Sequence, residues 1–270
     1  MPIPEYNTLL IEDSDAITWI VLNRPHTRNA LSDELLKELS EVLTILETQG
    51  APVIGIRGAG SAFSSGYDIS PDEEEIGGLG RRNIIEERTR LRSRIGRLMA
   101  LWDHPKPTIA AVHGPCLAGG AQLASLCDLT IVADNAVIGE PTLPIGGGYM
   151  EPFWTFLIGP KQAKMMALDP GARFNAEQAV QWGWANYSVE NQNLISAVNE
   201  LATRIARVHP DVLEVKKSSV NRYYEDRGIR SALVSGAETD ALLHFATPVR
   251  EMSESIRKNG LAHTIKEFHG

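Results

Sequence analysis

Residues 53–69 read VIGIRGAGSAFSSGYDI, and residues 108–122 read TIAAVHGPCLAGGAQ. Each stretch begins with an apolar, β-branched run that predicts a buried strand and then continues into glycine and other small residues. Glycines at a strand end let backbone N–H groups face a cavity with no side chain in the way. Two such groups converging on one oxygen would form an oxyanion hole. Tight turns and close helix–strand packing would need the same glycines, so both interpretations stay open here.

The flanking sequence indicates an α/β protein. Residues 17–22 form another β-branched run, and Ser32 is a typical N-cap before a helix with one apolar face. Further patterns predict a strand at 129–133 and a long helix from residue 84, whose arginines could pair with the acidic run at 72–75, contact another subunit or meet a phosphate. Later helices are expected to begin near Asn193, Pro210 and Gly228. We therefore expect a core over residues 1–190 and a helical region over residues 191–270.

Composition limits the partners and the compartment. The 270 residues are 43% apolar and carry a net charge of −8, which argues against nucleic acid or an anionic membrane surface as partner. No apolar run approaches the roughly 18–20 residues of a membrane span, and the first residues lack a signal-peptide pattern, so we expect a cytoplasmic protein. Cys116 and Cys127 stand apart from any metal-binding spacing and are predicted to be reduced core residues, with no metal site.

Several motifs, in order, resemble the crotonase (enoyl-CoA hydratase/isomerase) superfamily. They are Asn23-Arg24-Pro25 with Asn29-Ala30-Leu31, Ala62 to Ile69, Pro105 to Gly114 with Ala118-Gly119-Gly120, and Ala176 to Asn186. The resemblance implies a spiral of ββα units with a helical C-terminal region that trimerises, as a homotrimer or homohexamer. It also implies an acyl-CoA substrate whose coenzyme A is part of the substrate, and no separate cofactor.

The resemblance also assigns roles to residues. The two backbone N–H groups that would hold an enolate oxygen fall on Tyr67 and Gly119. The positions that match coenzyme A and substrate contacts are Arg28, Ala30, Ser65, Asp68 and Ile69. Arg28 could offer charge to a phosphate or could be a plain surface arginine.

Two departures from the family pattern bear on the reaction. Hydratases of this family use two glutamates, and the matching positions here hold Gln122 and Thr142. Neither side chain can take up and return a proton near neutral pH. We therefore expect weak or absent hydration by the two-glutamate mechanism.

Two other acids are candidates for proton transfer. Glu140 lies two residues before the vacant position, and the alternative is a surface or subunit-contact glutamate. Glu151 precedes an apolar stretch that would raise its pKa if buried, and the alternative is a charge at a helix N-terminus. Tyr149 is a candidate for orienting substrate.

Three functions remain open from the sequence. The first is an enzyme of the enoyl-CoA hydratase/isomerase type that acts on an acyl-CoA through an enolate held in an oxyanion hole. The second is a hydrolase that cleaves a C–C bond in a β-diketone or β-keto thioester. The third is an acyl-CoA-binding protein without catalysis.

Overall fold

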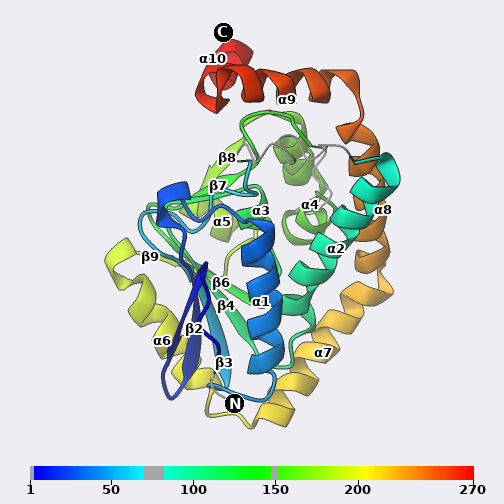
Figure 1. Ribbon diagram of the computed structural model, residues 1–270. Coiled ribbons are helices and arrows are strands. Elements are labelled where there is room, and N and C mark those ends of the chain that lie inside the picture. The colour runs from blue at the N-terminus through cyan, green and yellow to red at the C-terminus, as the bar shows by residue number, and fades with distance from the viewer. Residues whose placement is uncertain (1–2, 70–81, 147–150) are drawn as a thin grey trace.

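A computed structural model describes residues 3–69, 82–146 and 151–270, which form two β-sheets surrounded by helices (Figure 1). The strands are β1 (Leu9–Asp13), β2 (Ile17–Leu22), β3 (Val53–Gly58), β4 (Thr108–Val112), β5 (Pro115–Leu117), β6 (Leu129–Ala133), β7 (Val137–Gly139), β8 (Arg173–Asn175) and β9 (Tyr187–Val189). The helices are α1 (Asp33–Leu46), α2 (Ile84–Asp103), α3 (Gly119–Ser125), α4 (Glu151–Leu168), α5 (Ala176–Gln181), α6 (Leu194–Ile205), α7 (Pro210–Asp226), α8 (Ile229–His244), α9 (Thr247–Asn259) and α10 (Leu261–His269), with short 3-10 turns η1 (Pro25–Thr27) and η3 (Asn191–Asn193).

The larger sheet has the strand order β1-β2-β3-β4-β6-β9, in which β1 is antiparallel to β2 and all later neighbours are parallel. The strands predicted at 17–22, 108–112 and 129–133 are confirmed. Arg57 pairs with Ala111, so β3 and β4 end side by side. The two glycine-bearing segments therefore leave the sheet at the same edge, where ligands of open parallel sheets bind.

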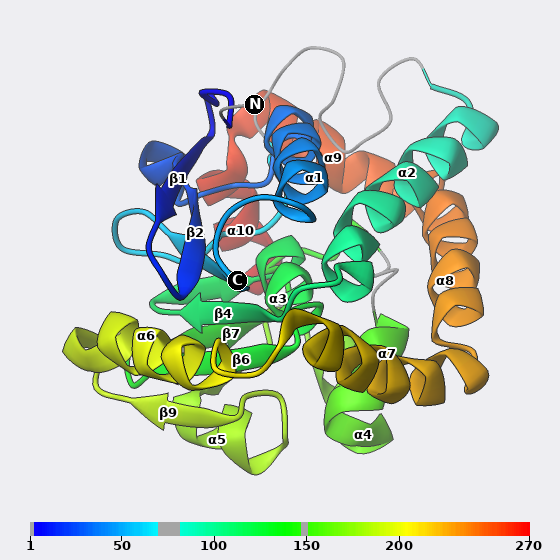
Figure 2. The same ribbon diagram turned by 90° about the horizontal axis from the view of Figure 1, so that it is seen from below.

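Helices cover both faces of this sheet, which explains why its central strands are mostly apolar and buried at nearly every position. On β2, Ile20 and Leu22 join the large core beneath α1 and α2, whereas Trp19 and Val21 face a smaller core closed by α6. Figures 1 and 2 both show α6 and α1 on opposite sides of the sheet. Both cysteines are buried free thiols, as predicted.

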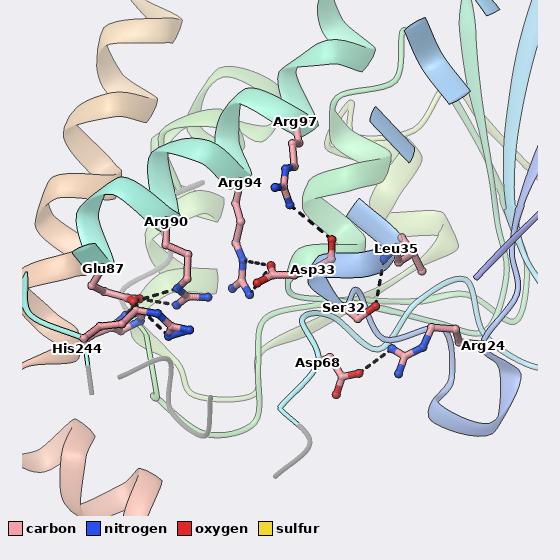
Figure 3. A network of polar contacts seen from close by, with 11 residues as sticks. Arg24, Ser32, Asp33, Leu35, Asp68, Glu87, Arg90, Arg94, Arg97 and His244 are labelled. Atoms are coloured by element: carbon pink, nitrogen blue, oxygen red, sulfur yellow. Dashed lines mark hydrogen bonds and ion pairs between the residues drawn. The ribbon is translucent and has the colours of Figure 1, made fainter. Parts of the chain in front are cut away.

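Local signals set the helix ends. The Ser32 side chain accepts a hydrogen bond from the Leu35 amide and caps α1 (Figure 3), and α7 starts at Pro210 as predicted. The helix expected to begin near Asn193 starts at Leu194 with Asn193 as its N-cap residue, and Gly228 takes the same position before α8.

Among the described helices none is long and apolar enough to cross a membrane.

The region after residue 190 is helical and wraps back onto the core. Lys217 on α7 lies 2.8 Å from Asp128, whose carboxylate also accepts hydrogen bonds from the amide and hydroxyl of Thr108. Helices α9 and α10 cross the end of the molecule above the second sheet, β5-β7-β8 (Figure 1). The C-terminal helices therefore reach the edge at which the glycine-bearing segments end.

Candidate active site

Backbone hydrogen bonds join the two glycine-bearing segments. The amide of Phe63 donates to His113 O (2.9 Å), that of Ser64 to Pro115 O (3.1 Å), and that of Leu117 to Ser64 O (3.0 Å). These bonds form a short parallel bridge beyond the ends of β3 and β4. The segments are thus held side by side before any side chain contributes.

Three glycines allow the segments to approach closely. A Cβ atom on Gly66, which has φ +104°, would lie 2.9 Å from Ala118 Cβ and 3.6 Å from the Gly119 nitrogen. A Cβ on Gly120 would lie 2.7 Å from Ser64 Cβ, closer than real Cβ contacts. The two segments therefore approach each other too closely at Gly66 and Gly120 for a side chain at either position.

Asn29 ties the residue 24–31 segment to the first glycine-bearing segment. Its amide nitrogen donates to Ala59 O and Ala62 O, each at 2.8 Å, and its amide oxygen accepts from the Arg24 backbone at 3.0 Å. The side chain is fully buried, and the residue has φ +56°, a left-handed conformation that asparagine tolerates better than most residues. These hydrogen bonds give Asn29 of the Asn29-Ala30-Leu31 motif a structural role.

Tyr67 and Gln122 connect the segments through their side chains. The Tyr67 hydroxyl donates to Gln122 Oε1 at 2.9 Å, and the guanidinium of Arg94 lies 5.1 Å from the centre of the Tyr67 ring. A Cβ on Gly119 would touch the same ring at 2.9 Å. The residue at the first glutamate position of the hydratases therefore serves here as a hydrogen-bond acceptor for Tyr67.

These residues line a cavity of about 400 Å³ at the edge of the sheet. Eight of the predicted site residues are in its wall: Arg28, Ser65, Tyr67, Asp68, Ile69, Gln122, Glu140 and Thr142. Helix α10 contributes Leu261 and Ile265. The sequence motifs and the C-terminal helices therefore meet around one space.

Glu140 is buried in the wall of this cavity, which corrects the alternative that placed it on the surface. Its residue is 7% exposed, and its Oε1 atom has no hydrogen-bond partner in the described part of the chain. Burial raises the pKa of Glu140 to about 7, although the nearby charge of Arg173 and a hydrogen bond from Trp154 oppose the rise. A carboxyl group with this pKa can both accept and donate protons near neutral pH.

The second glutamate position of the hydratases has a structural partner. Arg173 donates from Nη2 to the Thr142 hydroxyl at 3.1 Å and from Nη1 to the backbone carbonyl of Glu140. The guanidinium thus fixes the segment that carries Glu140 and Thr142. Thr142 supplies a hydroxyl to the wall and no titratable group.

Of the remaining predicted residues, Ala30 has a described position near the site, whereas the side chains of Tyr149 and Glu151 do not. Ala30 is buried, and its carbonyl accepts from Arg24, which also forms an ion pair with Asp68 at 2.6 Å (Figure 3). Tyr149 lies outside the described residues, as does the side chain of Glu151, whose backbone begins α4.

Helices α2 and α8 contribute polar side chains to this site, and Glu87, Asp240 and His244 among them were not predicted from the sequence. Arg90, Arg94, Asp240 and His244 all line the cavity, and His244 hydrogen-bonds with Glu87, 157 positions away in sequence. No local spacing could have indicated this contact. Two of the arginines noted on this helix pair within the chain, Arg94 with Asp33 and Arg90 with Glu87, and the acidic run at 72–75 lies outside the described residues.

The described residues offer no cluster of three or more histidine, cysteine or carboxylate side chains suited to a metal ion. The polar side-chain groups of the wall include carboxylate, imidazole, guanidinium, phenol, hydroxyl and amide groups. They can transfer protons and bind anionic or carbonyl oxygens.

The fold and site place the chain in the crotonase superfamily. A crystal structure of an enoyl-CoA hydratase/isomerase from Xanthobacter autotrophicus Py2 matches with a TM-score of 0.88 and 32% identity over 97% of both chains. One from Novosphingobium aromaticivorans DSM 12444 with the same family description matches with a TM-score of 0.90 and 40% identity, covering 98% of this chain and 96% of the other.

The sequence itself identifies the family. The model of the enoyl-CoA hydratase/isomerase family matches residues 12–255, so the chain belongs to this family. Hydroxycinnamoyl-CoA hydratase-lyase of Pseudomonas fluorescens is 31% identical over 224 residues, which are 82% of this chain and 80% of that protein. Mevalonyl-coenzyme A hydratase of Aspergillus fumigatus is 32% identical over 225 residues, 80% and 78% of the two chains. This membership supports an enzyme.

Proposed function

We propose that this protein is an enzyme that acts on an acyl-CoA thioester through an enolate. The names of its relatives point to CoA thioesters as the substrate class. The observation that carries the proposal is Glu140, a buried carboxyl group with an unpartnered oxygen in the same cavity wall as Tyr67 and Gln122.

In the proposed step, ionised Glu140 takes the proton from the α-carbon of the thioester. The electron pair of the broken C–H bond delocalises onto the thioester oxygen, which the backbone N–H groups of Tyr67 and Gly119 would stabilise. Loss of one such donor typically costs about 3–4 kcal/mol in the barrier. Protonated Glu140 can then return the proton to the enolate, because its pKa of about 7 makes both protonation states accessible.

The backbone bridge and the close approach at Gly66 and Gly120 support this arrangement, since they hold the two proposed donor segments together. Arg28 and Ile69 also line the cavity and are suited to the coenzyme A portion. Coenzyme A would enter as part of the substrate, and the step requires no other cofactor. We expect the chain to act in the cytoplasm as a homotrimer or homohexamer.

Ordinary hydration is not the expected reaction. Gln122 accepts from Tyr67 and Thr142 accepts from Arg173, so both hydratase positions hold neutral side chains with structural partners. Incubation with crotonyl-CoA should show little loss of the enoyl absorbance. Turnover similar to that of ordinary hydratases would contradict the roles given to Gln122 and Thr142.

The direct test is exchange of the α-protons of butyryl-CoA in D₂O, followed by mass spectrometry. Glu140→Gln should slow the exchange at least about 100-fold, because the amide cannot accept the proton. Glu41→Gln, a change at an exposed glutamate on α1, is the matched control and should exchange at the wild-type rate. Saturable binding of butyryl-CoA without exchange would favour a binding protein instead.

A further inference from the structure

A histidine and a glutamate from distant parts of the chain meet at the wall of the cavity. His244 Nδ1, on α8, lies 2.8 Å from Glu87 Oε1, on α2 (Figure 3). The Glu87 side chain is fully buried and that of His244 is 9% exposed. Of the two, His244 lines the cavity. The pair therefore joins a buried carboxylate to a ring at the ligand space.

The charge of Glu87 determines which ring nitrogen carries the proton. Burial alone would raise the pKa of Glu87, but hydrogen bonds from His244 and Arg90 outweigh it and lower the pKa to about 2. An ionised carboxylate can only accept hydrogen bonds, so Nδ1 must donate. In the neutral imidazole the Nε2 atom is then unprotonated and has a free lone pair.

The Nε2 atom lies against the segment that carries Glu140. A Cβ atom on Gly146 would lie 3.3 Å from it, and Gly146 lines the cavity together with Glu140. Asp240 Oδ1 is 3.7 Å from Nε2 on the side of α8. The unprotonated nitrogen is therefore placed between a carboxylate and the ligand space.

Charged groups surround this ring on both sides. Glu87 and Asp240 face its two nitrogens, and Glu140 lies on the segment packed against it. The cations face Glu87: Arg90 forms an ion pair with it and Arg82 lies 4.0 Å away. The ring therefore has a carboxylate near each of its nitrogens, Glu87 at Nδ1 and Asp240 at Nε2.

We propose that His244 is a second proton acceptor of this site, that it acts on an O–H group of water bound beside Gly146, and that Glu87 is its positioning residue. This rests on the proposed function, because it requires the same cavity to hold the substrate. With an enoyl thioester, the proton moves from the water oxygen to Nε2, and the O–H electron pair forms the C–O bond at the β-carbon. The π electrons of the C=C bond move onto the thioester oxygen as the enolate, and protonated Glu140 delivers its proton to the α-carbon. The imidazolium and the ionised Glu140 then exchange protons with solvent, so water is the only other reactant.

The arrangement differs from that of Glu140, which would act on a C–H bond. Glu87 holds the ring in one tautomer, as a carboxylate does for the histidine of a hydrolytic triad. Arg90 already donates to both oxygens of the Glu87 carboxylate. The histidine adds a base at the ligand space.

The tautomer can be measured directly by ¹⁵N NMR of the full-length protein with labelled histidine. We expect an Nδ1-protonated ring for His244 near neutral pH, and a shift of its Nε2 resonance when butyryl-CoA is added. An Nε2-protonated ring, or an Nε2 resonance that bound butyryl-CoA leaves unchanged, would overturn the assignment.

Reactivity provides a second measurement. Diethyl pyrocarbonate should carbethoxylate His244, and saturating butyryl-CoA should slow this reaction at least tenfold. Exposed His209, at the start of α7, is the internal control and should react equally with and without the thioester. Glu87→Gln should slow modification of His244 about tenfold, whereas Glu41→Gln should not. Failure of His244 to react in the wild-type protein would also overturn the proposal.

Binding of butyryl-CoA is measured separately by calorimetry, so the two proposals can fail independently. Bound thioester without protection of His244 counts against His244 alone. Absence of binding counts against the proposed function, and the tautomer and the carbethoxylation then decide whether His244 is a reactive base.

The role in water activation is tested with crotonyl-CoA in H₂¹⁸O, where mass spectrometry detects slow addition. Relative to α-proton exchange of butyryl-CoA, incorporation of ¹⁸O should fall at least tenfold in His244→Gln. An unchanged ratio, or no incorporation by the wild-type protein, would refute action on water.

Discussion

Replacing Glu140 by glutamine should stabilise the protein at alkaline pH while abolishing its reaction. The carboxyl group has a pKa of 4.5 when unperturbed and about 7 in the folded chain. Between these values the folded state binds more protons than the unfolded state, so the free energy of unfolding falls as pH rises. This loss of unfolding free energy is absent below the lower pKa and reaches its full size above the upper pKa. At about 1.4 kcal/mol per pH unit, it reaches roughly 3 kcal/mol.

Glutamine cannot ionise, so Glu140→Gln removes this pH dependence. The difference in unfolding free energy between variant and wild type should therefore increase by about 2–3 kcal/mol from about pH 5 to about pH 8. Urea unfolding at fixed protein concentration at the two pH values measures it, with Glu41→Gln as the exposed control. A difference that stays constant, or that decreases with pH, would refute the argument that burial raises this pKa.

Three further outcomes are expected. The rate of α-proton exchange should rise through an apparent pKa near 7, because only ionised Glu140 accepts the proton, and a flat pH profile would exclude it as the base. Asn29→Ala should lower the free energy of unfolding by about 3–5 kcal/mol, since it removes three hydrogen bonds and leaves alanine at φ +56°. Urea unfolding beside the exposed control Asn259→Ala tests this, and a loss as small as the control's would contradict it. Light scattering should give three or six times the protomer mass of 29.6 kDa, and a monomer would exclude the expected assembly.

Much of the fold could be predicted because its signals are local. The β-branched runs at 17–22, 108–112 and 129–133 became strands, and Ser32 and Pro210 mark helix starts through hydrogen bonding and backbone geometry that depend on neighbouring residues alone. The short strands β5, β7 and β8 were not predicted, because three-residue strands carry too little periodicity.

The sequence by itself determined the two glycine-bearing segments and the family resemblance, and it predicts Gln122 and Thr142 at the positions that the resemblance matches to the hydratase glutamates. Only the tertiary structure decided that Glu140 is buried rather than exposed. Its pKa follows from this burial and from the neighbouring side chains of Arg173 and Trp154. It also decided that His244 meets Glu87, since packing of α2 against α8 creates that contact. The amino-acid sequence shows which chemical groups the chain carries, whereas desolvation and long-range contacts determine which of these groups can transfer a proton.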